Sequence, residues 1–531
     1  MFVKTTRVIK KGKQYTCYLL TESFRDEKGI PRNRHLLNIT SWGEEKIVAL
    51  KQLLKGVAFS SLDQLKTQSG KAIGALYVFK KLAEEMGMLK AIKNKKMGSY
   101  MLLLMIGRIL TQGSRLKLLE WGQTEEIEEV LGISPDKLTT DDLYETLDYI
   151  AEHQEEIEQA LFTFRAEKIG KIPKIYLYDV TSSYLEGEQN ELAAWGYNRD
   201  KKQGKMQIVI GLLTDEQGYP FAVKVFEGNT QDPKTVHTQI TKLAASFGVR
   251  EVIFIGDKGM VKTAQIDELD TYGFHYITSI TKPQIHTLLK KGILQLSLFE
   301  ERLGEIADTD NGLRYVYRRN PERAKEMEKT RKEKLERLRS IIAKENIYLA
   351  FHPKAKLERI QKKLLDIAEK YGSFIFIGFN NRTFSMSIDQ TILEKEKSLD
   401  GCYVIKTDCM EQDLTAQIIH DRYKDLKYVE AAFRTIKTGF LEVRPIYVRK
   451  ETRTRGHVFM SMLAYLLIHE FKKRTKDIEG TLEHKIDTLD KLQTVSITLA
   501  NQTIKRVPTP HEFTQSIFTA CHLTPPIFCS N

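Results

Sequence analysis

The apolar residues of this chain change their spacing several times along its length. In residues 1–59 they fall in short runs, at 3–9, 15–21 and 34–40, which predict three strands of a small N-terminal β-ribbon. In residues 60–168 they recur at three- and four-residue intervals, as in DLYETLDYIAEHQEEIEQALFTF, and predict a helical domain. The chain therefore begins with a β-ribbon followed by a bundle of helices.

Residues 169–284 alternate strands with amphipathic helices. The predicted strands are 174–186, 206–214, 221–226, 251–256 and 274–280, and the predicted helices are 236–247 and 263–271. Three strands in hairpin order, then helices and strands in alternation, predict an α/β sheet with an antiparallel edge. This β-β-β-α-β-α-β order is that of a ribonuclease H-like core.

The regular alternation stops at residue 285, and we interpret residues 285–415 as a large insertion in that core. Its predicted elements are helices at 322–345 and 356–371 and strands near 374–377 and 401–406. Residues 416–475 return to apolar helices that would complete the core. The last segment, 476–531, mixes a weak helix with loops that contain Thr and Pro.

The composition is that of an ordinary globular protein with a basic charge. The 531 residues are 41% hydrophobic and 29% charged, with 82 Lys and Arg against 70 Asp and Glu, a net charge of +12. This apolar content excludes a disordered chain, and no apolar run reaches the roughly 18–20 residues of a membrane span. The N-terminus lacks the apolar region of a secretion signal, and five scattered cysteines are typical of a reducing compartment. We therefore expect a cytoplasmic protein with no membrane partner.

Two aspartates follow apolar runs in neighbouring predicted strands. Asp179 ends the run IYLYD and Asp257 ends the run VIFIGD. Carboxylates at the ends of adjacent core strands open onto a common crevice in α/β proteins. They repel each other unless a cation lies between them, and hard divalent ions such as Mg²⁺ take oxygen ligands of this kind. The simpler alternative is that each aspartate only caps a turn.

A third carboxylate comes from the predicted helix 418–438. Tyr423, Glu430 and Lys437 are seven residues apart and would fall on one face of that helix. Arg434 lies one turn after Glu430 on the same stripe. Taken alone, this pattern would indicate a surface helix with an ion pair between Glu430 and Arg434.

The ordered blocks around these carboxylates resemble the DDE transposases of bacterial insertion sequences. The resembling blocks are YDVTSSY at Asp179, GYNRDKKQGKMQIVIGLLTDEQGYPFAVKVFEGNTQDPKT, IGDKGM at Asp257 and the helix that carries Glu430. They cover about residues 174–280 and 423–465. Several blocks in the right order make this resemblance more specific than any single motif.

Within these transposases the chain is most similar to the IS-four superfamily, whose signature is Tyr-x2-Arg-x3-Glu-x6-Lys. The chain has Tyr423, Glu430 and Lys437 at three of the signature positions, but Leu426 at the position of the arginine. The residues that could supply the missing charge are Lys427, Arg422 and Arg434.

The resemblance implies a Mg²⁺-dependent transposase. Asp179, Asp257 and Glu430 would be the catalytic and metal-binding triad for two Mg²⁺ ions, with Mn²⁺ as a substitute. The enzyme would bind terminal inverted repeats as double-stranded DNA, cleave the element ends and join the 3′-hydroxyl to target DNA. We expect a nucleoid-associated homodimer in the DNA complex, with residues 60–168 binding the DNA ends.

Basic clusters outside the triad are predicted DNA contacts. The loop 199–205 lies beside the first hairpin, with a solvated loop as the alternative, and the segment 444–455 precedes an apolar helix. Positive charge alone favours a polyanionic partner only weakly. With the helix residues, the predicted DNA-binding set is Tyr423, Arg434, Lys437, Arg199, Lys201, Lys202, Arg449, Arg453 and Arg455.

Other chemistries find no support in the sequence. It contains no GxxxxGK(S/T), GxGxxG, HExxH or GxSxG motif, so no nucleotide cofactor is expected. Two alternatives stay open: a non-catalytic DNA-binding protein derived from a transposase, and a ribonuclease H-like nuclease without strand transfer. The sequence does not separate the nuclease from the transposase, because nicking and joining use the same site.

Overall fold

The structure is a computed structural model of the chain. It describes residues 1–10, 13–56, 66–200, 202–410, 414–437, 439–499 and 502–527. The chain divides into two compact units, which we describe separately. The smaller unit comprises Met1–Ala72, Lys491–His511 and Pro525–Asn531, and the larger unit comprises Ile73–Asp490 and Glu512–Thr524.

The predicted N-terminal β-ribbon is confirmed in the smaller unit. β1 (Phe2–Lys10), β2 (Lys13–Arg25) and β3 (Pro31–Asn38) form an antiparallel sheet in sequence order, and α1 (Glu44–Leu53) follows.

The smaller unit also contains a sheet made from distant parts of the sequence. β4 (Lys66–Ala72) pairs with β15 (Gln493–Leu499), which pairs with β16 (Gln502–Arg506). Gly70 is required there, because a Cβ atom would lie 2.0 Å from Thr494 Oγ1. The sequence pattern predicted helix and loop for these segments. KTQSGKA, the sequence of β4, has no apolar alternation that would reveal a strand.

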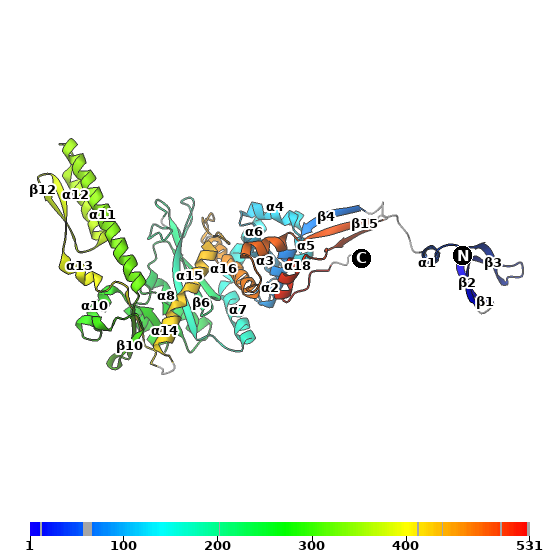
Figure 1. The fold of residues 1–531 in the computed structure, drawn as a ribbon, viewed down its shortest axis with the longest axis horizontal. Coiled ribbons are helices and arrows are strands. Elements are labelled where there is room, and N and C mark those ends of the chain that lie inside the picture. Colours follow the sequence, from blue (N-terminus) through cyan, green and yellow to red (C-terminus); the bar gives the residue numbers. More distant parts are fainter. Residues whose placement is uncertain are drawn as a thin grey trace. The chain divides into compact units, whose positions relative to one another are not determined.

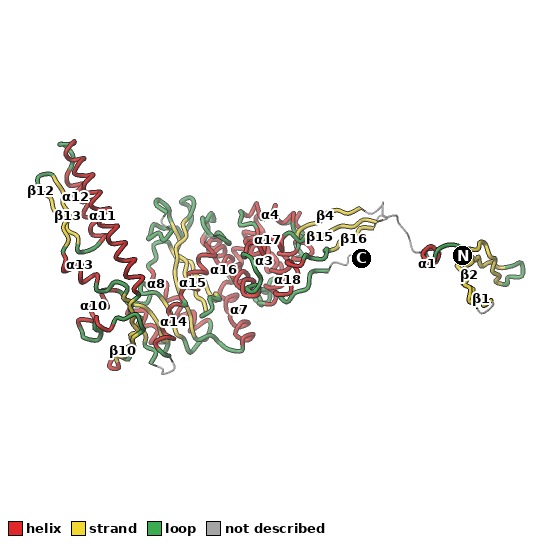
Figure 2. Tube along the Cα trace, in the orientation of Figure 1, coloured by secondary structure: helices red, strands yellow, loops and turns green. Residues whose placement is uncertain are grey.

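Helices make up one part of the larger unit, and several of them pack on α16 (Glu451–Arg474), which is buried along most of its length. Figure 2 shows this group of helices in red beside the yellow strands of the core. Among the helices in the described ranges, none is long and apolar enough to cross a lipid bilayer. The other helices of this part are α2 (Gly74–Glu85), α3 (Lys95–Leu110), α4 (Arg115–Thr124), α5 (Ile127–Leu131), η2 (Pro135–Lys137), α6 (Thr140–Glu152), α7 (Gln154–Ile169), α17 (Leu482–Asp490) and α18 (Glu512–Ala520).

The core sheet has the predicted element order. Its strands are β5 (Ile175–Tyr184), β6 (Gln207–Asp215), β7 (Pro220–Glu227), β8 (Ile253–Gly256) and β9 (His275–Ser279), with α8 (Asp232–Thr241), the π-helical turn η3 (Lys242–Ser246) and α9 (Thr263–Thr271) between them. They lie in the order β7-β6-β5-β8-β9, and only the β5–β8 and β8–β9 pairs are parallel. This mixed sheet is consistent with a ribonuclease H-like core.

The insertion extends the core sheet at the β9 edge. β14 pairs with β9, β11 with β14 and β10 with β11, all antiparallel. A separate apolar core around Leu338, Leu364 and Phe374 holds the helix pair α11–α12, which extends away from the sheet in Figure 1. The elements are α10 (Lys282–Lys290), η4 (Leu296–Leu298), β10 (Gly304–Asp308), η5 (Thr309–Asn311), β11 (Leu313–Arg319), α11 (Pro321–Phe351), α12 (Leu357–Tyr371), β12 (Ile375–Asn380), β13 (Thr383–Ile388), α13 (Gln390–Lys397) and β14 (Cys402–Thr407).

The single helix predicted at 418–438 is wrong, because two helices occupy this region. α14 (Ala416–Lys424) ends at Asp425, and α15 (Leu426–Lys437) begins directly after it. The Asp425 carboxylate pairs with Arg422 at 3.1 Å within the last turn of α14. Asp425 is the C-cap of α14, and its backbone amide donates to the carbonyl oxygens of Asp421 and Arg422 at 3.0 and 3.1 Å.

The crossing of α6 and α16 depends on a glycine. A Cβ atom on Gly456 would lie 2.1 Å from the carbonyl oxygen of Leu147, a backbone atom that cannot rotate away. Gly456→Ala should therefore push the two helices apart and lower the stability by about 1–3 kcal/mol, a typical cost of overpacking. The melting temperature measures this loss.

Gly98→Ala in α3 is the matched control. Its Cβ atom would meet only the end of the Leu89 side chain, at 3.3 Å. Alanine also favours a helix over glycine, so this variant should keep or raise the melting temperature. Equal destabilisation by both variants would contradict the crossing argument.

Candidate active site

Two aspartates lie side by side in the core sheet. β5 and β8 are parallel with Tyr178 opposite Gly256, so Asp179 and Asp257 each follow one residue later. The strand predicted at 174–186 is observed as β5, which continues past Asp179 to Tyr184 in register with β6, so the interpretation of Asp179 as a strand-end carboxylate is wrong. Asp257 does follow the last residue of its strand. Asp179 is half-buried as a result, and Asp257 is exposed.

The next backbone amide orients each carboxylate. Val180 N donates to Asp179 Oδ1 at 2.8 Å, and Lys258 N donates to Asp257 Oδ1 at 2.8 Å. Each aspartate carboxylate is therefore oriented in part by the backbone of its own segment.

Glu430 reaches this site from α15. The helix buries Val429, Phe433 and Ile436 on the side that packs on β5 and β6, and leaves Glu430 exposed. Its charge acts on Asp179 together with that of Asp257. The three predicted acidic residues therefore lie at one place.

The environment of Asp179 opposes its ionisation. Burial, the largest cause, raises the pKa of Asp179 to about 7, and the negative charges of Glu430 and Asp257 add to this effect. The hydrogen bond from Val180 and the more distant Arg199 guanidinium act in the opposite direction. A cation between the carboxylates would remove most of this penalty.

Tyr423 lies on α14 rather than on the helix of Glu430, and it still reaches the site. Its hydroxyl is 3.2 Å from Asp257 Oδ1 and 2.7 Å from Ser279 Oγ. Burial raises the pKa of Tyr423, so the hydroxyl stays protonated and can donate to Asp257. Ser279 on β9 was missed by the sequence analysis, because no motif marks it.

Lys437 is buried and is bound inside the protein. Its Nζ donates to Thr181 Oγ1 on β5 at 2.9 Å and pairs with Asp200. Arg444 pairs with the same carboxylate, which is 2% exposed. We call Asp200, Lys437 and Arg444 the Asp200 cluster. It connects the end of α15 to β5 and so determines the position of Glu430 relative to Asp179.

The sequence analysis did not identify Asp200 or Arg444 as part of the site. Both lie in stretches that were interpreted as DNA contacts because of their positive charge. A usable signal was present, since Asp200 is the one acidic residue of the basic run RDKKQGK. An acid inside such a run is a candidate for internal ion pairing.

The structure places the other predicted DNA contacts in two groups. Arg434, Lys202 and Arg449 are exposed, whereas Lys201 lies outside the described residues. The remaining arginines are engaged within the protein: Arg199 with Asp232, Arg453 with Asp148 at 3.1 Å, and Arg455 with Glu451 at 2.7 Å.

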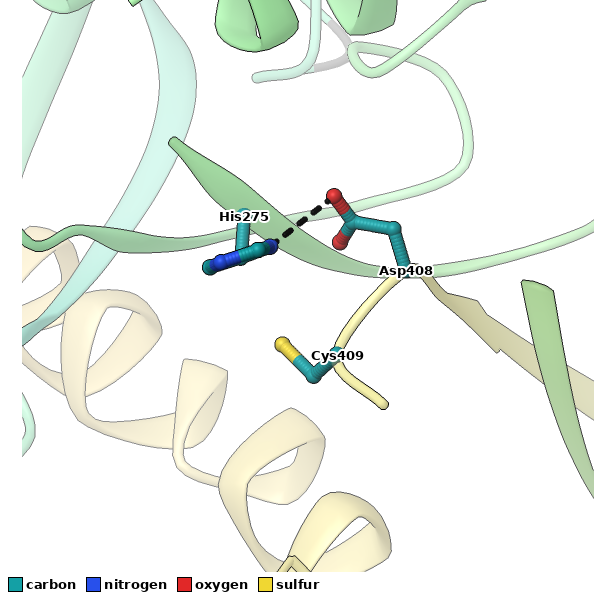
Figure 3. Close-up of side chains that lie close together, drawn as sticks. All are labelled: His275, Asp408 and Cys409. Carbon is teal, nitrogen blue, oxygen red and sulfur yellow. Dashed lines mark hydrogen bonds and ion pairs between the residues drawn. The ribbon is translucent and has the colours of Figure 1, made fainter. Parts of the chain in front are cut away.

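A second group of possible metal ligands lies near the start of β9, in the described part of the chain. His275, Asp408 and Cys409 offer ligand atoms within 4.8 Å of one another (Figure 3). His275 Nδ1 is 3.1 Å from Asp408 Oδ2, and Tyr276 N donates to Asp408 Oδ1 at 2.9 Å. Both oxygens of Asp408 thus connect the end of β14 to β9. Nitrogen and sulfur suit zinc, whereas the all-oxygen set of Asp179, Asp257 and Glu430 fits Mg²⁺ or Mn²⁺.

Two family models match the chain. Residues 170–467 match the family described as transposase DDE domain, and residues 3–68 match the N-terminal domain of IS1634 family transposases. Among solved structures, the chain is similar to a chain of the piggyBac transposase synaptic complex with hairpin DNA, seen by cryo-electron microscopy. That likeness has 10% identity and a TM-score of 0.36 over 75% of this chain and 70% of that chain, too low to support an argument. No curated protein matches the chain.

The raised pKa of Asp179 predicts a specific dependence of stability on pH. Because the folded protein binds the Asp179 proton more tightly than the unfolded chain, the free energy of unfolding should fall as pH rises from about 4 to 7. Asp179→Asn removes this titration. In EDTA the variant should melt at a higher temperature than the unaltered protein, by more at pH 8 than at pH 5.

Mg²⁺ supplies the control for this experiment. It should raise the melting temperature of the unaltered protein at pH 8 and do so less for Asp179→Asn. If the melting temperature of Asp179→Asn exceeds that of the unaltered protein by the same amount at pH 5 and pH 8, the proposed electrostatic penalty is contradicted.

Proposed function

The chain belongs to the DDE transposases and carries the N-terminal domain of the IS1634 family, and we propose that it cleaves the ends of its own insertion sequence and joins them to target DNA. The feature that supports this proposal is the adjacent register of Asp179 and Asp257, with α15 packed on β5 and the charge of Glu430 acting on Asp179. Such a site suits phosphoryl transfer, because an all-oxygen set of ligands can hold divalent ions.

Asp179, Asp257 and Glu430 would hold two Mg²⁺ or Mn²⁺ ions. When bound, such a pair activates the attacking oxygen and stabilises charge on the leaving oxygen. The adjacent backbone amides keep the two aspartate carboxylates turned in fixed directions. Water would attack first to nick the element end, and the freed 3′-hydroxyl would attack target DNA later.

Tyr423 and Lys437 would act through these carboxylates. The Tyr423 hydroxyl orients Asp257 by donating to Oδ1, and Ser279 lies within reach on the other side. Lys437 holds the end of α15 through the Asp200 cluster. Both are therefore proposed as positioning residues, and the burial of Lys437 argues against the direct phosphate contact expected from the sequence.

DNA contacts are proposed for the exposed cations. Arg434 lies one helical turn after Glu430, and Lys202 and Arg449 are exposed on separate loops, so each can reach backbone phosphates. Lys201, next to Lys202 in the sequence, stays in this proposed set on sequence grounds. Arg199, Arg453 and Arg455 are only half-exposed and form ion pairs within the protein, which favours a role in stabilising the fold.

Recognition of the terminal inverted repeats is proposed for residues 60–168, as the sequence suggested. Within this stretch α2, α3 and α6 pack on α16, which supports a firm connection between a DNA-binding part and the catalytic core. A homodimer in the DNA complex is also proposed, since two element ends must be brought to one target.

Removing one carboxylate tests the triad. Asp257→Asn should slow nicking of terminal-repeat DNA by roughly a thousandfold, because an ion held by it contributes several kcal/mol to the transition state. Asp270→Asn, an exposed aspartate at the end of α9, is the matched control and should nick normally. Normal nicking by Asp257→Asn would refute the assignment of this residue.

Joining distinguishes a transposase from a nuclease. Precut ends with a free 3′-hydroxyl should be joined to plasmid DNA in the presence of Mg²⁺. Nicking of uncut ends without any joining of precut ends would instead identify a ribonuclease H-like nuclease.

Tyr423→Phe removes the hydroxyl that orients Asp257. Loss of a group that orients a metal ligand typically costs about 10–100-fold in activity or metal affinity. The variant should therefore nick more slowly and need more Mn²⁺ for half-maximal activity, at an unchanged melting temperature. Tyr428→Phe, on the exposed part of α15, is the control. An unchanged Mn²⁺ requirement in Tyr423→Phe would rule out the proposed role.

A further inference from the structure

Two arginines lie together beneath a pocket on the larger unit, away from the carboxylates. Arg108 is near the end of α3, and Arg115 is the first residue of α4. The pocket has a volume of about 450 Å³. Its lining includes Arg108, Gln112, Arg115, Tyr144, Arg444 and His457.

These guanidinium groups are held by neutral partners. Arg108 donates to the carbonyl oxygens of Leu441 at 2.5 Å and Gly113 at 3.3 Å. Arg115 Nη2 lies 3.1 Å from His457 Nδ1. Within the residues that the structure describes, neither arginine forms an ion pair, and the shielded Nε of Arg115 has no hydrogen-bond partner. Arg108 and Arg115 are half-buried, and positive charge in such a position is costly without a counter-charge, so this arrangement calls for an anion.

The electrostatics of the pocket agree with this reasoning. Burial lowers the pKa of Arg115 and lowers that of Arg108 to about 10, with a further decrease from the neighbouring Arg115 charge. Burial and the two arginines lower the pKa of His457 well below its usual value, so the imidazole is neutral. Glu442 is the acidic residue on the lining, and it offsets only part of the positive charge.

The other cations at the pocket have partners of their own. Arg444 pairs with Asp200, and Arg453, which lies over the Tyr144 ring, pairs with Asp148. Arg108 and Arg115 therefore remain the sources of unneutralised charge.

The backbone at the rim is strained. Gln112 and Glu442 have φ values of 54° and 39°, a left-handed conformation that is unfavourable for residues other than glycine. Both residues line this pocket. Strain of this kind concentrates at binding and catalytic sites, where the surrounding structure maintains it.

We propose that this pocket, the Arg115 pocket, binds a backbone phosphate of the DNA on which the carboxylates act. The inference rests on the proposed function and names a further contact for the same substrate. Guanidinium forks match phosphate oxygens, and the volume greatly exceeds that of a monatomic anion. Arg444 belongs to both the pocket and the Asp200 cluster, so the bound phosphate would lie on the same DNA segment as the cleavage site.

Arg115→Gln tests the pocket, because Arg108 also anchors backbone carbonyls and is a poorer choice. Loss of one phosphate contact should weaken DNA binding roughly tenfold or more. The slope of log affinity against log salt should become shallower by about 0.9. Terminal-repeat and scrambled DNA should be affected by the same factor, since a phosphate contact reads no sequence.

Lys325→Gln on α11 is the matched control, with the same loss of charge on an exposed side chain outside the pocket and outside residues 60–168. It should leave the affinity and the salt slope close to those of the unaltered protein. An equal change of affinity and salt slope in both variants would mean that only the total charge of the protein matters. It would overturn the proposal that the pocket binds a phosphate.

Inorganic phosphate is the second probe. Compared with chloride at equal ionic strength, it should raise the melting temperature of the unaltered protein but not that of Arg115→Gln. Without phosphate, Arg115→Gln should melt at the same or a higher temperature, because it removes an unpaired charge. A lower melting temperature with an unchanged salt slope would assign Arg115 a purely structural role and overturn the proposal.

The outcomes also separate this inference from the proposed function. If the unaltered protein neither binds nor nicks terminal-repeat DNA, the proposed function fails. If it does both, and Arg115→Gln keeps its affinity and salt slope, only the phosphate pocket fails.

Discussion

The central constraint of this structure is the repulsion between carboxylates that the fold holds together. The parallel register of β5 and β8 places Asp179 and Asp257 on adjacent strands, and α15 adds Glu430. Each element is fixed by its own backbone hydrogen bonds, so the charges cannot move apart without breaking the sheet. Burial is the largest cause of the raised pKa of Asp179, and the charges of Glu430 and Asp257 add to it. Divalent cations would offset this cost.

The remaining parts of the core maintain this arrangement across a long stretch of sequence. The insertion separates Asp257 from Glu430 in the chain, but it adds its strands at the β9 edge and leaves the pairing of β5 with β8 intact. The Asp200 cluster then brings α15 back to β5 through buried ion pairs. A buried carboxylate that satisfies two cations specifies one docking position for the helix, because loss of either partner would leave a charge uncompensated.

The sequence was most informative about elements that depend only on residues close together in the chain. The apolar runs that end in Asp179 and Asp257 predicted the core strands, since such runs depend only on nearby residues. It was least informative where distant segments meet. The pairing of β4 with β15 joins positions from opposite ends of the chain, and the helical periodicity that placed Lys437 beside Glu430 could not reveal Asp200 as its partner. The break at Asp425 was also missed, because the apolar spacing continues through it.

Iron-directed cleavage of the protein backbone tests the central claim most directly. Fe²⁺ substitutes for Mg²⁺ at oxygen-rich sites and, with ascorbate and peroxide, cuts the backbone beside the bound ion. We predict cuts near residues 179, 257 and 430, which would be suppressed by excess Mg²⁺ and lost in Asp257→Asn. Cleavage confined to the neighbourhood of His275 and Asp408, or none at the three carboxylates, would contradict the account.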